Sequence, residues 1–382
     1  MCVQNKTILH ITNDYTGSKV YKNLINELDN LDVEQIIYTP LRQKDKVGVN
    51  KINFKVVNSK IIYSLILNWH LDRFFYPYKI IKILKDIESK VDFSHIKCIH
   101  AHTWYSDGGV AYLLSKKYNI PYIVTVRNTD LNLFQKKIIY LRPFGQKILN
   151  NAKKIILISA SYKKRILNQK SLKSVKYKIE EKIQVIPNGV DPFWIQNIST
   201  KKNKEINGIF NILYIGKFTK GKQVPLLQEA VIRLNKKFSY KIMLHIVGKG
   251  GEDETFVLDM VKKHSKIFLY YGQIVDKSEL LNILRYCDVF AMPSQHETFG
   301  LVYIEAMLQG LPILYTADEG IDGFYNKNIG EKVNEHTIEE IVHKISKIIT
   351  NYDQYSIPLK EIKNNHNWIK IAKRYIDNCY NL

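Results

Sequence analysis

The sequence predicts an α/β protein made of two doubly wound, Rossmann-like domains, and three observations support that prediction. The chain has 382 residues, and because domains usually hold roughly 100–200 residues, two domains are expected. Short, almost continuously apolar runs alternate with amphipathic stretches, which is typical of parallel strands buried on both faces and connected by helices. The alternation breaks at Pro187, Asn188 and Gly189 and then starts again.

The first half of the chain carries six expected strands and five expected helices. The strands are 7–12, 35–38, 98–102, 122–126, 154–159 and 184–186. The helices lie near 18–29, 75–89, 107–118, 133–150 and 160–170. We expect these elements to form a first domain of residues 1–187, which the C-terminal helical segment 366–382 rejoins.

The second half repeats the alternation after a Lys-rich stretch near 199–208. Its expected strands are 211–215, 241–247, 267–271, 289–292 and 312–315. Its expected helices lie near 222–237, 253–265, 277–286, 300–309 and 337–350. We expect a second domain of residues 188–365, facing the first across a cleft. Ligands of such sheets bind outside the carboxyl ends of the strands, so residues just after strands are the candidates for a site.

The positive charge is concentrated in the first half of the chain. The whole chain has 57 basic and 36 acidic residues and a net charge of +21. Residues 1–182 account for +18 of that charge, and the stretch 136–182 alone holds 14 basic and 2 acidic residues. Such a field attracts a polyanion, namely an anionic membrane, a phosphorylated substrate or a nucleic acid. The alternative is a Lys-rich composition without a partner.

The cysteines and the apolar runs indicate a protein of the cytoplasm. The four cysteines (Cys2, Cys98, Cys287 and Cys379) form no CxxC pair, so neither a disulfide framework nor a zinc ribbon is expected. The N-terminal segment reads as a first strand rather than a signal peptide. No apolar run reaches the roughly 18 residues of a membrane-spanning helix.

The segment 293–310 contains the most informative arrangement of polar residues. Glu305 is the only charged residue between Thr298 and Ala317. A buried carboxylate needs hydrogen-bond donors, and the vicinal diol of a ribose supplies two. Glu297 lies on the loop before the helix, where it can hold a second set of hydroxyls. The start of that helix is a ready anion site, formed by the backbone N–H groups of Phe299, Gly300, Leu301 and Val302. The alternative is that Glu297 is an ordinary surface residue and Glu305 an ordinary residue on one face of the helix.

Two glycine-containing turns follow other strands of the second domain. Gly216 is followed by Lys217 and Lys222, two cations that can neutralise a diphosphate. Gly248 and Gly250 also follow a strand, and they allow a base or a ribose to approach the backbone. Their sequence lacks the third glycine of a dinucleotide-binding fingerprint.

Polar residues also follow three strands of the first domain. A glycine loop containing Gly17 and Ser18 follows the first strand, His102 and Trp104 end the third, and Arg127, Asn128 and Asp130 end the fourth. The sequence contains no HExxH, no CxxC and no Asp-x-Asp pair, so no metal site is expected.

These motifs together resemble glycosyltransferase family 4, whose members have the GT-B fold. The segment HETFGLVYIEAM, with Glu297 and Glu305 eight residues apart, is similar to the family's E-x7-E element. IGKFTKGK is similar to its pyrophosphate element, VIPNGVD to its interdomain segment and VGKGGE to the loop beside the base. IHAHTWYSDGG and IPYIVTVRNTD are similar to strands of the acceptor domain. Arg127 and Asn128 stand where many members have His-Gly, so Arg127 or Asp130 is expected to replace that histidine.

The resemblance implies a metal-independent transferase that retains the configuration of the transferred sugar and needs no cofactor besides its nucleotide-sugar substrate. It favours a UDP-sugar over a GDP-sugar. The implied catalytic residues are Glu297, Lys217, Lys222, Arg127 and Asp130. The implied donor-binding residues are Gly17, Ser18, Gly216, Gly248, Gly250, Ile274, His296, Phe299, Gly300, Leu301, Val302 and Glu305. The acceptor-side candidates are His102, Trp104 and Asn128.

We therefore expect a glycosyltransferase of surface polysaccharide synthesis that uses a saccharide or lipid-linked saccharide acceptor. Its basic first domain would bind the inner face of the cytoplasmic membrane, and nucleic acid is not expected as a partner. Aromatic residues at Phe74, Phe75, Tyr76 and Tyr78, with the apolar run 61–67, offer a second membrane contact. The alternatives are a sugar-nucleotide epimerase of related architecture and a non-enzymatic protein that binds RNA or lipid.

Overall fold

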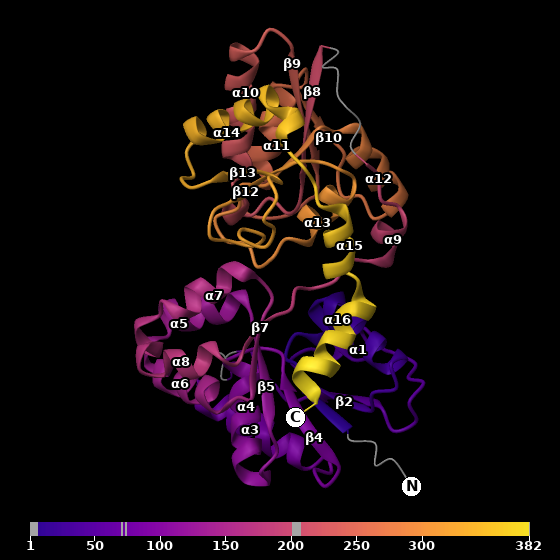
Figure 1. Cartoon of the computed structure of the whole chain (residues 1–382), viewed down its shortest axis with the longest axis vertical. Coiled ribbons are helices and arrows are strands. Elements are labelled where there is room, and N and C mark those ends of the chain that lie inside the picture. The colour runs from indigo at the N-terminus through magenta and orange to yellow at the C-terminus, as the bar shows by residue number, and fades with distance from the viewer. Residues whose placement is uncertain (1–6, 70–71, 73–74, 201–207, 382) are drawn as a thin grey trace. The chain divides into compact units, whose positions relative to one another are not determined.

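A computed structural model describes residues 7–69, 72, 75–200 and 208–381. The chain divides into two compact units (Figure 1). Unit 1 consists of Met1–Ile158, Tyr162–Gly189 and Trp368–Leu382, and unit 2 of Ser159–Ser161 and Val190–Asn367. The C-terminal segment therefore belongs to the unit that contains the N-terminus.

Unit 1 is built on a seven-stranded parallel sheet. Its strands are β1 (Thr7–Ile11), β2 (Gln35–Leu41), β3 (Lys60–Leu65), β4 (Ile96–Ala101), β5 (Tyr122–Val126), β6 (Lys154–Leu157) and β7 (Ile183–Val185), in the order β3-β2-β1-β4-β5-β6-β7. The order reverses between β1 and β4, and the register of that pair places His10 beside His100. The central strands are buried, which explains their continuous apolar sequences.

The helices of unit 1 cover both faces of this sheet. They are α1 (Lys19–Asn30), α3 (Tyr76–Glu88), α4 (Ser106–Tyr118), α5 (Gln135–Lys137), α6 (Arg142–Asn151), α7 (Ala160–Leu167), α8 (Lys176–Glu180) and α16 (Trp368–Tyr375). The apolar face of α1 packs against α16, and Leu24 and Leu28 share one core cluster with Trp368 and Ile371. Figure 1 shows α16, in yellow, lying along α1. The buried Trp368 ring lies directly over Gly189, where an added Cβ would be 2.5 Å from the indole.

Unit 2 is built on a six-stranded parallel sheet. Its strands are β8 (Ile209–Ile215), β9 (Lys241–Val247), β10 (Phe268–Tyr270), β11 (Val289–Ala291), β12 (Ile313–Thr316) and β13 (Gly330–Val333), in the order β10-β9-β8-β11-β12-β13. Its helices are α9 (Pro192–Gln196), α10 (Val224–Lys237), α11 (Glu254–Lys263), α12 (Lys277–Tyr286), α13 (Leu301–Leu308), α14 (Ile338–Thr350) and α15 (Leu359–Asn365). The strand order reverses between β8 and β11.

The structure adds two strands and divides one helix relative to the sequence prediction. β3 and β13 are edge strands with partly exposed, partly polar sequences, so they lack the continuous apolar signal of a central strand. The single helix expected at 133–150 is wrong, because α5 and α6 are separate there. Pro143 lies in the first turn of α6, where its missing N–H removes no helical hydrogen bond.

Cys98, Cys287 and Cys379 are buried, whereas Cys2 lies outside the described residues. In the described part of the chain, no helix combines the length and the apolar character needed to span a membrane.

Candidate functional site

The candidate donor site lies where the strand order of the second sheet reverses. β8 and β11 are neighbours there, and their connections leave in opposite directions. Doubly wound sheets bind ligands at the carboxyl ends of the two strands that flank such a point. The turn after β8 contains Gly216, Lys217 and Lys222, and the loop after β11 contains residues 293–300.

The turn after β8 holds its two lysines in different environments. The Tyr214 hydroxyl donates to the Lys217 carbonyl at 2.8 Å and so fixes the start of the turn. The Lys217 side chain is exposed, whereas that of Lys222 is half-buried at the mouth of α10. Burial raises the pKa of Tyr214, and the nearby Glu297 carboxylate adds to that shift.

The loop after β11 is fixed by hydrogen bonds to two other segments. The Gln295 N–H donates to the Gly221 carbonyl at 2.8 Å, which joins the loop to the lysine turn. The Thr316 hydroxyl donates to the Ser294 carbonyl at 2.7 Å, and the Gly320 N–H to the Glu297 carbonyl at 3.0 Å. Gly300 has a φ of 73° and lies against the Tyr303 ring, so a side chain at this position would be strained. These contacts therefore fix the conformation of the loop and the direction in which α13 begins.

An ion pair connects the two segments. Lys222 Nζ lies 2.5 Å from Glu297 Oε2 and 3.6 Å from the Met292 sulfur. The structure thus brings together a lysine and a glutamate that are 75 residues apart in sequence. Phe299 is buried against Phe324 and His366, while Leu301 and Val302 begin α13 beside the same loop.

Glu319 belongs to this site and was missed by the sequence prediction. One carboxylate oxygen accepts the Glu297 N–H at 3.2 Å, and the other lies 3.3 Å from Nδ1 of the exposed His296 ring. Its only sequence signal was its place after a strand, next to Gly320, in the turn that follows β12. The contact with Glu297 depends on how two separate loops meet.

Glu305 lies on α13 in a different environment from Glu297. Burial raises the pKa of its carboxyl to about 7, and the negative charge of Asp191 adds to the effect, while a hydrogen bond from Trp194 and the charge of Lys277 oppose it. Trp194 belongs to α9, which packs against α13. The half-buried carboxylate therefore has a donor and a cation beside it before any hydroxyl is added.

Two further glycine loops reach the same edge of the sheet. The Phe218 N–H donates to the Gly250 carbonyl at 2.7 Å, and the Gly248 N–H donates to the Gly272 carbonyl at 2.7 Å. A Cβ at Gly248 would lie 1.9 Å from the Gly216 carbonyl oxygen, so this glycine is needed for contact between loops. Gly250 has open space around an added Cβ, and Ile274 is half-buried against the core of unit 2.

In unit 1, the glycine loop after β1 has well-defined local contacts. Ser18 is the N-cap of α1, and its hydroxyl accepts the Val20 N–H at 3.4 Å. An added Cβ at Gly17 would collide with the Asp14 carboxylate at 2.1 Å. The loop is also tied to α4, because the Asn13 N–H donates to Asp107 at 3.1 Å.

Arg127 and Asp130 differ in what they offer to a substrate. The Arg127 guanidinium is half-buried, lies 5.0 Å from the centre of the Tyr21 ring and donates to the His102 carbonyl at 3.3 Å. The Asp130 side chain is buried and accepts the backbone N–H groups of Trp104, Tyr105 and Arg127 at 3.0, 3.1 and 2.8 Å. Burial raises the pKa of Asp130 to about 6, against the effect of these bonds. In this structure Asp130 joins two loops and presents no surface to a substrate.

The acceptor-side candidates are also separated by burial. The Trp104 indole is fully buried and donates to the Gly145 carbonyl at 2.9 Å, so it has no surface for an acceptor in this structure. Asn128 is half-buried and bonded to Asn132. His102 is fully buried and belongs to a cluster with His10 and His100.

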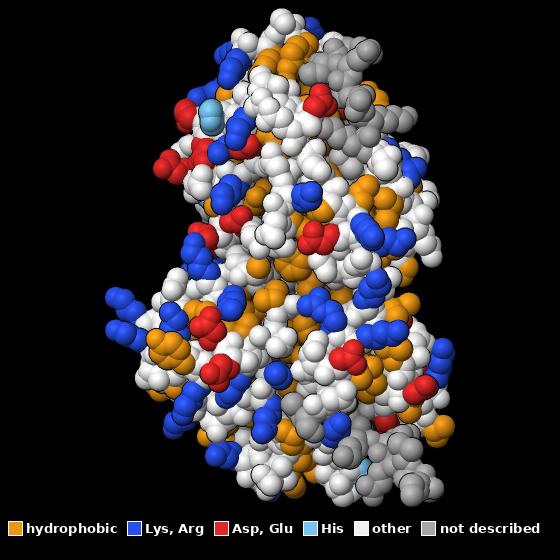
Figure 2. All heavy atoms as spheres, viewed as in Figure 1, with side chains coloured by type: hydrophobic (Ala, Val, Ile, Leu, Met, Phe, Trp, Pro, Cys, Tyr) orange, Lys and Arg blue, Asp and Glu red, His pale blue; other side chains and the backbone are white. Residues whose placement is uncertain are grey.

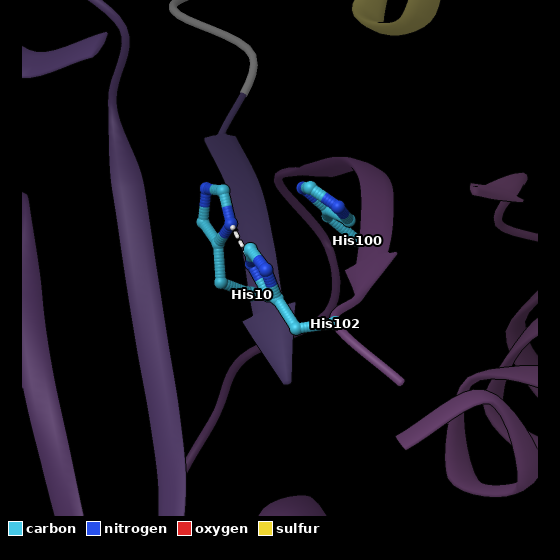
Figure 3. A group of neighbouring side chains, drawn as sticks. All are labelled: His10, His100 and His102. Carbon is cyan, nitrogen blue, oxygen red and sulfur yellow. Dashed lines mark hydrogen bonds between the residues drawn. The ribbon is translucent and has the colours of Figure 1, made fainter. Parts of the chain in front are cut away.

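The three histidines lie together at the ends of β1 and β4, as Figure 3 shows. His10 Nδ1 lies 3.0 Å from His102 Nε2, the bond drawn as a dashed line. Both ring nitrogens of His100 are bonded to hydroxyls, to Tyr380 at 2.7 Å and to Thr125 at 2.9 Å. The rings of His100 and His102 are stacked, with centroids 3.9 Å apart, so they present faces rather than lone pairs to each other. Burial lowers the pKa of all three, and the cluster is therefore neutral near pH 7.

A second buried group in unit 1 was not predicted from the sequence. Lys79 on α3 donates to the Ser106 hydroxyl at 3.0 Å, at the start of α4, close to Asp107. Burial lowers the pKa of Lys79 and raises that of Asp107, and each shift is opposed by the charge of the other residue. Of the two residues, Asp107 is also bonded to the loop after β1, through the Asn13 N–H.

Two protein-family models match the chain. Glycosyl transferases group 1 matches residues 196–375, and Glycosyltransferase Family 4 matches residues 17–193. An uncharacterised glycosyltransferase of Methanocaldococcus jannaschii is 30% identical over 292 residues, which are 74% of each chain. The alpha-monoglucosyldiacylglycerol synthase of Acholeplasma laidlawii is 26% identical over 348 residues, 84% of this chain and 82% of that protein.

Solved structures share the fold over nearly the whole chain. Sucrose-phosphate synthase from Thermosynechococcus elongatus has a TM-score of 0.69 at 17% identity and covers 97% of both chains. Anabaena HepE in complex with UDP has a TM-score of 0.69 at 14% identity and covers 99% of this chain and 100% of that chain.

Proposed function

Because the chain belongs to the group 1 glycosyltransferases of the GT-B fold, which transfer a sugar from a nucleotide sugar, we propose that its donor is held by unit 2 and that transfer retains the anomeric configuration. The observation that supports this proposal is the junction of the lysine turn with the loop after β11. The Gln295–Gly221 hydrogen bond and the Lys222–Glu297 ion pair place a cation, a carboxylate and the start of α13 at the switch point of the sheet.

In the proposed reaction, the bond between the sugar and the diphosphate breaks while the acceptor hydroxyl attacks from the same face, without an enzyme nucleophile. The hydroxyl proton passes to an oxygen of the departing diphosphate. Negative charge grows on the departing diphosphate. Preorganised cations and N–H groups stabilise such charge most effectively, and Lys217, Lys222 and the N-terminus of α13 have that role. Glu297 holds hydroxyls of the donor sugar and Glu305 those of the ribose.

Product analysis tests this reaction. The purified protein is incubated with UDP-sugars and GDP-sugars and with saccharide and lipid-linked acceptors, and the release of nucleoside diphosphate is followed. We expect release only in the presence of acceptor, with UDP-sugars preferred, which agrees with the UDP bound in the HepE structure. Proton NMR of the first product should show the anomeric configuration of the donor, and an inverted product would overturn the proposed mechanism.

Lysine variants test the role of the turn after β8. Lys217→Met and Lys222→Met should lower kcat by more than they raise the KM for the donor, because the charge that these lysines neutralise is largest in the transition state. Variants that raise only KM would instead indicate that the lysines bind the donor equally well in the ground state and in the transition state. The exposed Lys220, in the same turn, provides a matched control, since its replacement should change neither constant appreciably.

We also propose that the reaction needs no metal ion, because lysines and N–H dipoles supply the positive charge at the diphosphate. Activity measured with an excess of EDTA should stay close to that of the untreated protein. A loss of activity that Mg²⁺ or Mn²⁺ restores would contradict the proposal.

For the acceptor, we propose a lipid-linked saccharide of surface polysaccharide synthesis, reached from the cytoplasmic face of the membrane. The basic stretch 136–182 supports this choice, and the similarity to an alpha-monoglucosyldiacylglycerol synthase points in the same direction. Figure 2 shows Lys and Arg side chains spread over the visible face of unit 1. Exposed apolar side chains, Ile139, Tyr140 and Tyr177, lie among them in sequence.

A further inference from the structure

Lys222 and Glu297 form an ion pair, although the proposed function assigns them to different parts of the donor. In the proposed function Lys222 binds the diphosphate and Glu297 binds the sugar. In the structure each is the partner of the other, with 2.5 Å between Nζ and Oε2. Both side chains are largely shielded from solvent, with exposed fractions of 25% and 14%. Lys217, by contrast, is exposed.

The position of the Glu297 side chain is confined from several sides. An added Cβ at Gly300 or at Gly320 would lie 3.2 or 3.1 Å from Glu297 Cγ, so the two glycines enclose it. Its backbone N–H and carbonyl are bonded to Glu319 and Gly320. The backbone of the loop is therefore held in place, so the ion pair opens by rotation of the two side chains and not by movement of the loop.

A carboxylate and a diphosphate compete for one ammonium group. Charge-assisted hydrogen bonds of this kind are about twice as strong as neutral ones, so a ligand that displaces Glu297 must supply new donors for the released carboxylate. The hydroxyls of a donor sugar supply them. A nucleoside diphosphate without a sugar does not. It leaves the partly buried Glu297 Oε2 without its cation, while Oε1 keeps the Thr298 N–H at 3.0 Å.

From this geometry we propose that Glu297 is a specificity-determining residue that distinguishes the complete nucleotide sugar from the nucleoside diphosphate product. With the sugar present, Glu297 binds its hydroxyls and leaves Lys222 to the diphosphate. After transfer, Glu297 returns to Lys222 and lowers the affinity for the product, which speeds its release. This inference rests on the proposed function of unit 2 as the donor site.

Calorimetric titration with UDP and with GDP tests the competition. Glu297→Gln keeps the shape of the side chain and removes its charge, so it should lower the Kd for the preferred nucleoside diphosphate about three- to tenfold relative to the wild-type protein. With a complete UDP-sugar the same substitution should not improve binding, because lost hydrogen bonds to the sugar offset the gain. Glu297→Ala should also lower the Kd for the nucleoside diphosphate. It serves as the test variant if the Glu297→Gln protein folds poorly.

Two double variants separate the ion pair from a general effect of charge. The gain in affinity should disappear when Glu297→Gln is combined with Lys222→Met, and it should persist when Glu297→Gln is combined with Lys217→Met. An equal Kd in the wild-type protein and Glu297→Gln, or an undiminished gain without Lys222, would overturn the inference while leaving the donor site intact. If neither UDP nor GDP binds the wild-type protein, the proposed donor site itself is wrong.

Discussion

The ribose role proposed for Glu305 predicts nucleotide binding that depends on pH. The folded-state pKa of Glu305 is raised to about 7, and in the proposed role its charged carboxylate accepts the hydroxyls of a ribose diol. The Kd for the nucleoside diphosphate should therefore rise about tenfold as the pH falls from 8 to 6, since binding requires the loss of one proton. Calorimetric titration at several pH values measures this change.

The control for this prediction is Glu305→Gln. This variant should bind more weakly at pH 8, by about 2–4 kcal/mol for two lost charge-assisted hydrogen bonds. It should also show only the pH dependence that comes from the phosphate of the ligand. Identical pH profiles for the two proteins would contradict the assignment of Glu305 to the ribose.

Asp130 shows that a polar residue after a strand can have a structural role, because its side chain binds backbone N–H groups. Its two carboxylate oxygens accept three N–H groups. An asparagine offers one acceptor oxygen and turns its NH₂ group toward an N–H. Asp130→Asn should therefore lower the free energy of unfolding by about 2–4 kcal/mol, measured by urea titration. The turnover of the folded fraction should change much less than it does in Lys222→Met, and a selective loss of turnover at full stability would instead indicate a catalytic role.

At the scale of elements, the histidine cluster connects β1 and β4 to the C-terminal segment and makes their packing sensitive to acid. Burial lowers the pKa of His10 from 6.5 to about 3. The unfolded chain therefore binds a proton at His10 between these pH values and the folded chain does not. The stability that this histidine contributes is complete above pH 6.5 and is lost as the pH falls toward 3.

The corresponding prediction concerns the slope of stability against pH. His10→Phe should reduce that slope between pH 6 and 4 by about 1.4 kcal/mol per pH unit, relative to the wild-type protein. His100 and His102, whose pKa values are also lowered, add to the loss of stability at low pH. Asp107 and Asp130, whose pKa values are raised, oppose that loss. For this reason the difference between the two proteins is the test, and equal slopes in urea titrations would contradict it.

For the whole molecule, the uneven charge predicts salt-sensitive binding to anionic membranes through unit 1. Lysines near an anionic leaflet contribute about 1 kcal/mol each, and apolar side chains at the interface add to that. The protein should sediment with vesicles of phosphatidylglycerol and phosphatidylcholine at low salt, should be released at high salt and should not bind pure phosphatidylcholine. Equal binding to both kinds of vesicle, or none to either, would favour a Lys-rich composition without a partner.

Charge variants locate the membrane contact. Replacing Lys153, Lys163, Lys164 and Lys173 of unit 1 by Gln should abolish sedimentation and leave nucleotide affinity unchanged. Replacing Lys236, Lys262, Lys263 and Lys266 of unit 2 removes the same charge and should leave sedimentation intact. All eight residues are exposed.

The second membrane contact predicted from the sequence, at the aromatic residues 74–78 and the run 61–67, needs a correction. Tyr76 is buried and donates to the Tyr105 carbonyl at 2.7 Å, so its ring is not available to a membrane. Phe75 and Tyr78 are exposed, and Phe74 lies outside the described residues. The apolar run 61–67 includes most of β3, and in it Leu65 is exposed while Leu67 is buried.

The sequence by itself determined the fold class, the central strands and the candidate donor motifs of this protein. Central parallel strands are buried on both faces, so their apolar runs can be recognised without knowledge of their neighbours. Edge strands such as β3 and β13 lack that pattern, and pairing with a sheet is what makes them strands. The motifs after β8 and β11 could be found because glycines, lysines and glutamates at strand ends leave a local signal.

Only the tertiary structure decided which side chains meet. Lys222 pairs with Glu297 across 75 residues, and His10 with His102 across 92. Asp130 and Trp104 looked available for a substrate in the sequence and are buried in the structure. The physical reason is the same in each case, because partners and burial depend on the order and register in which distant strands pair, and the local sequence does not contain that information.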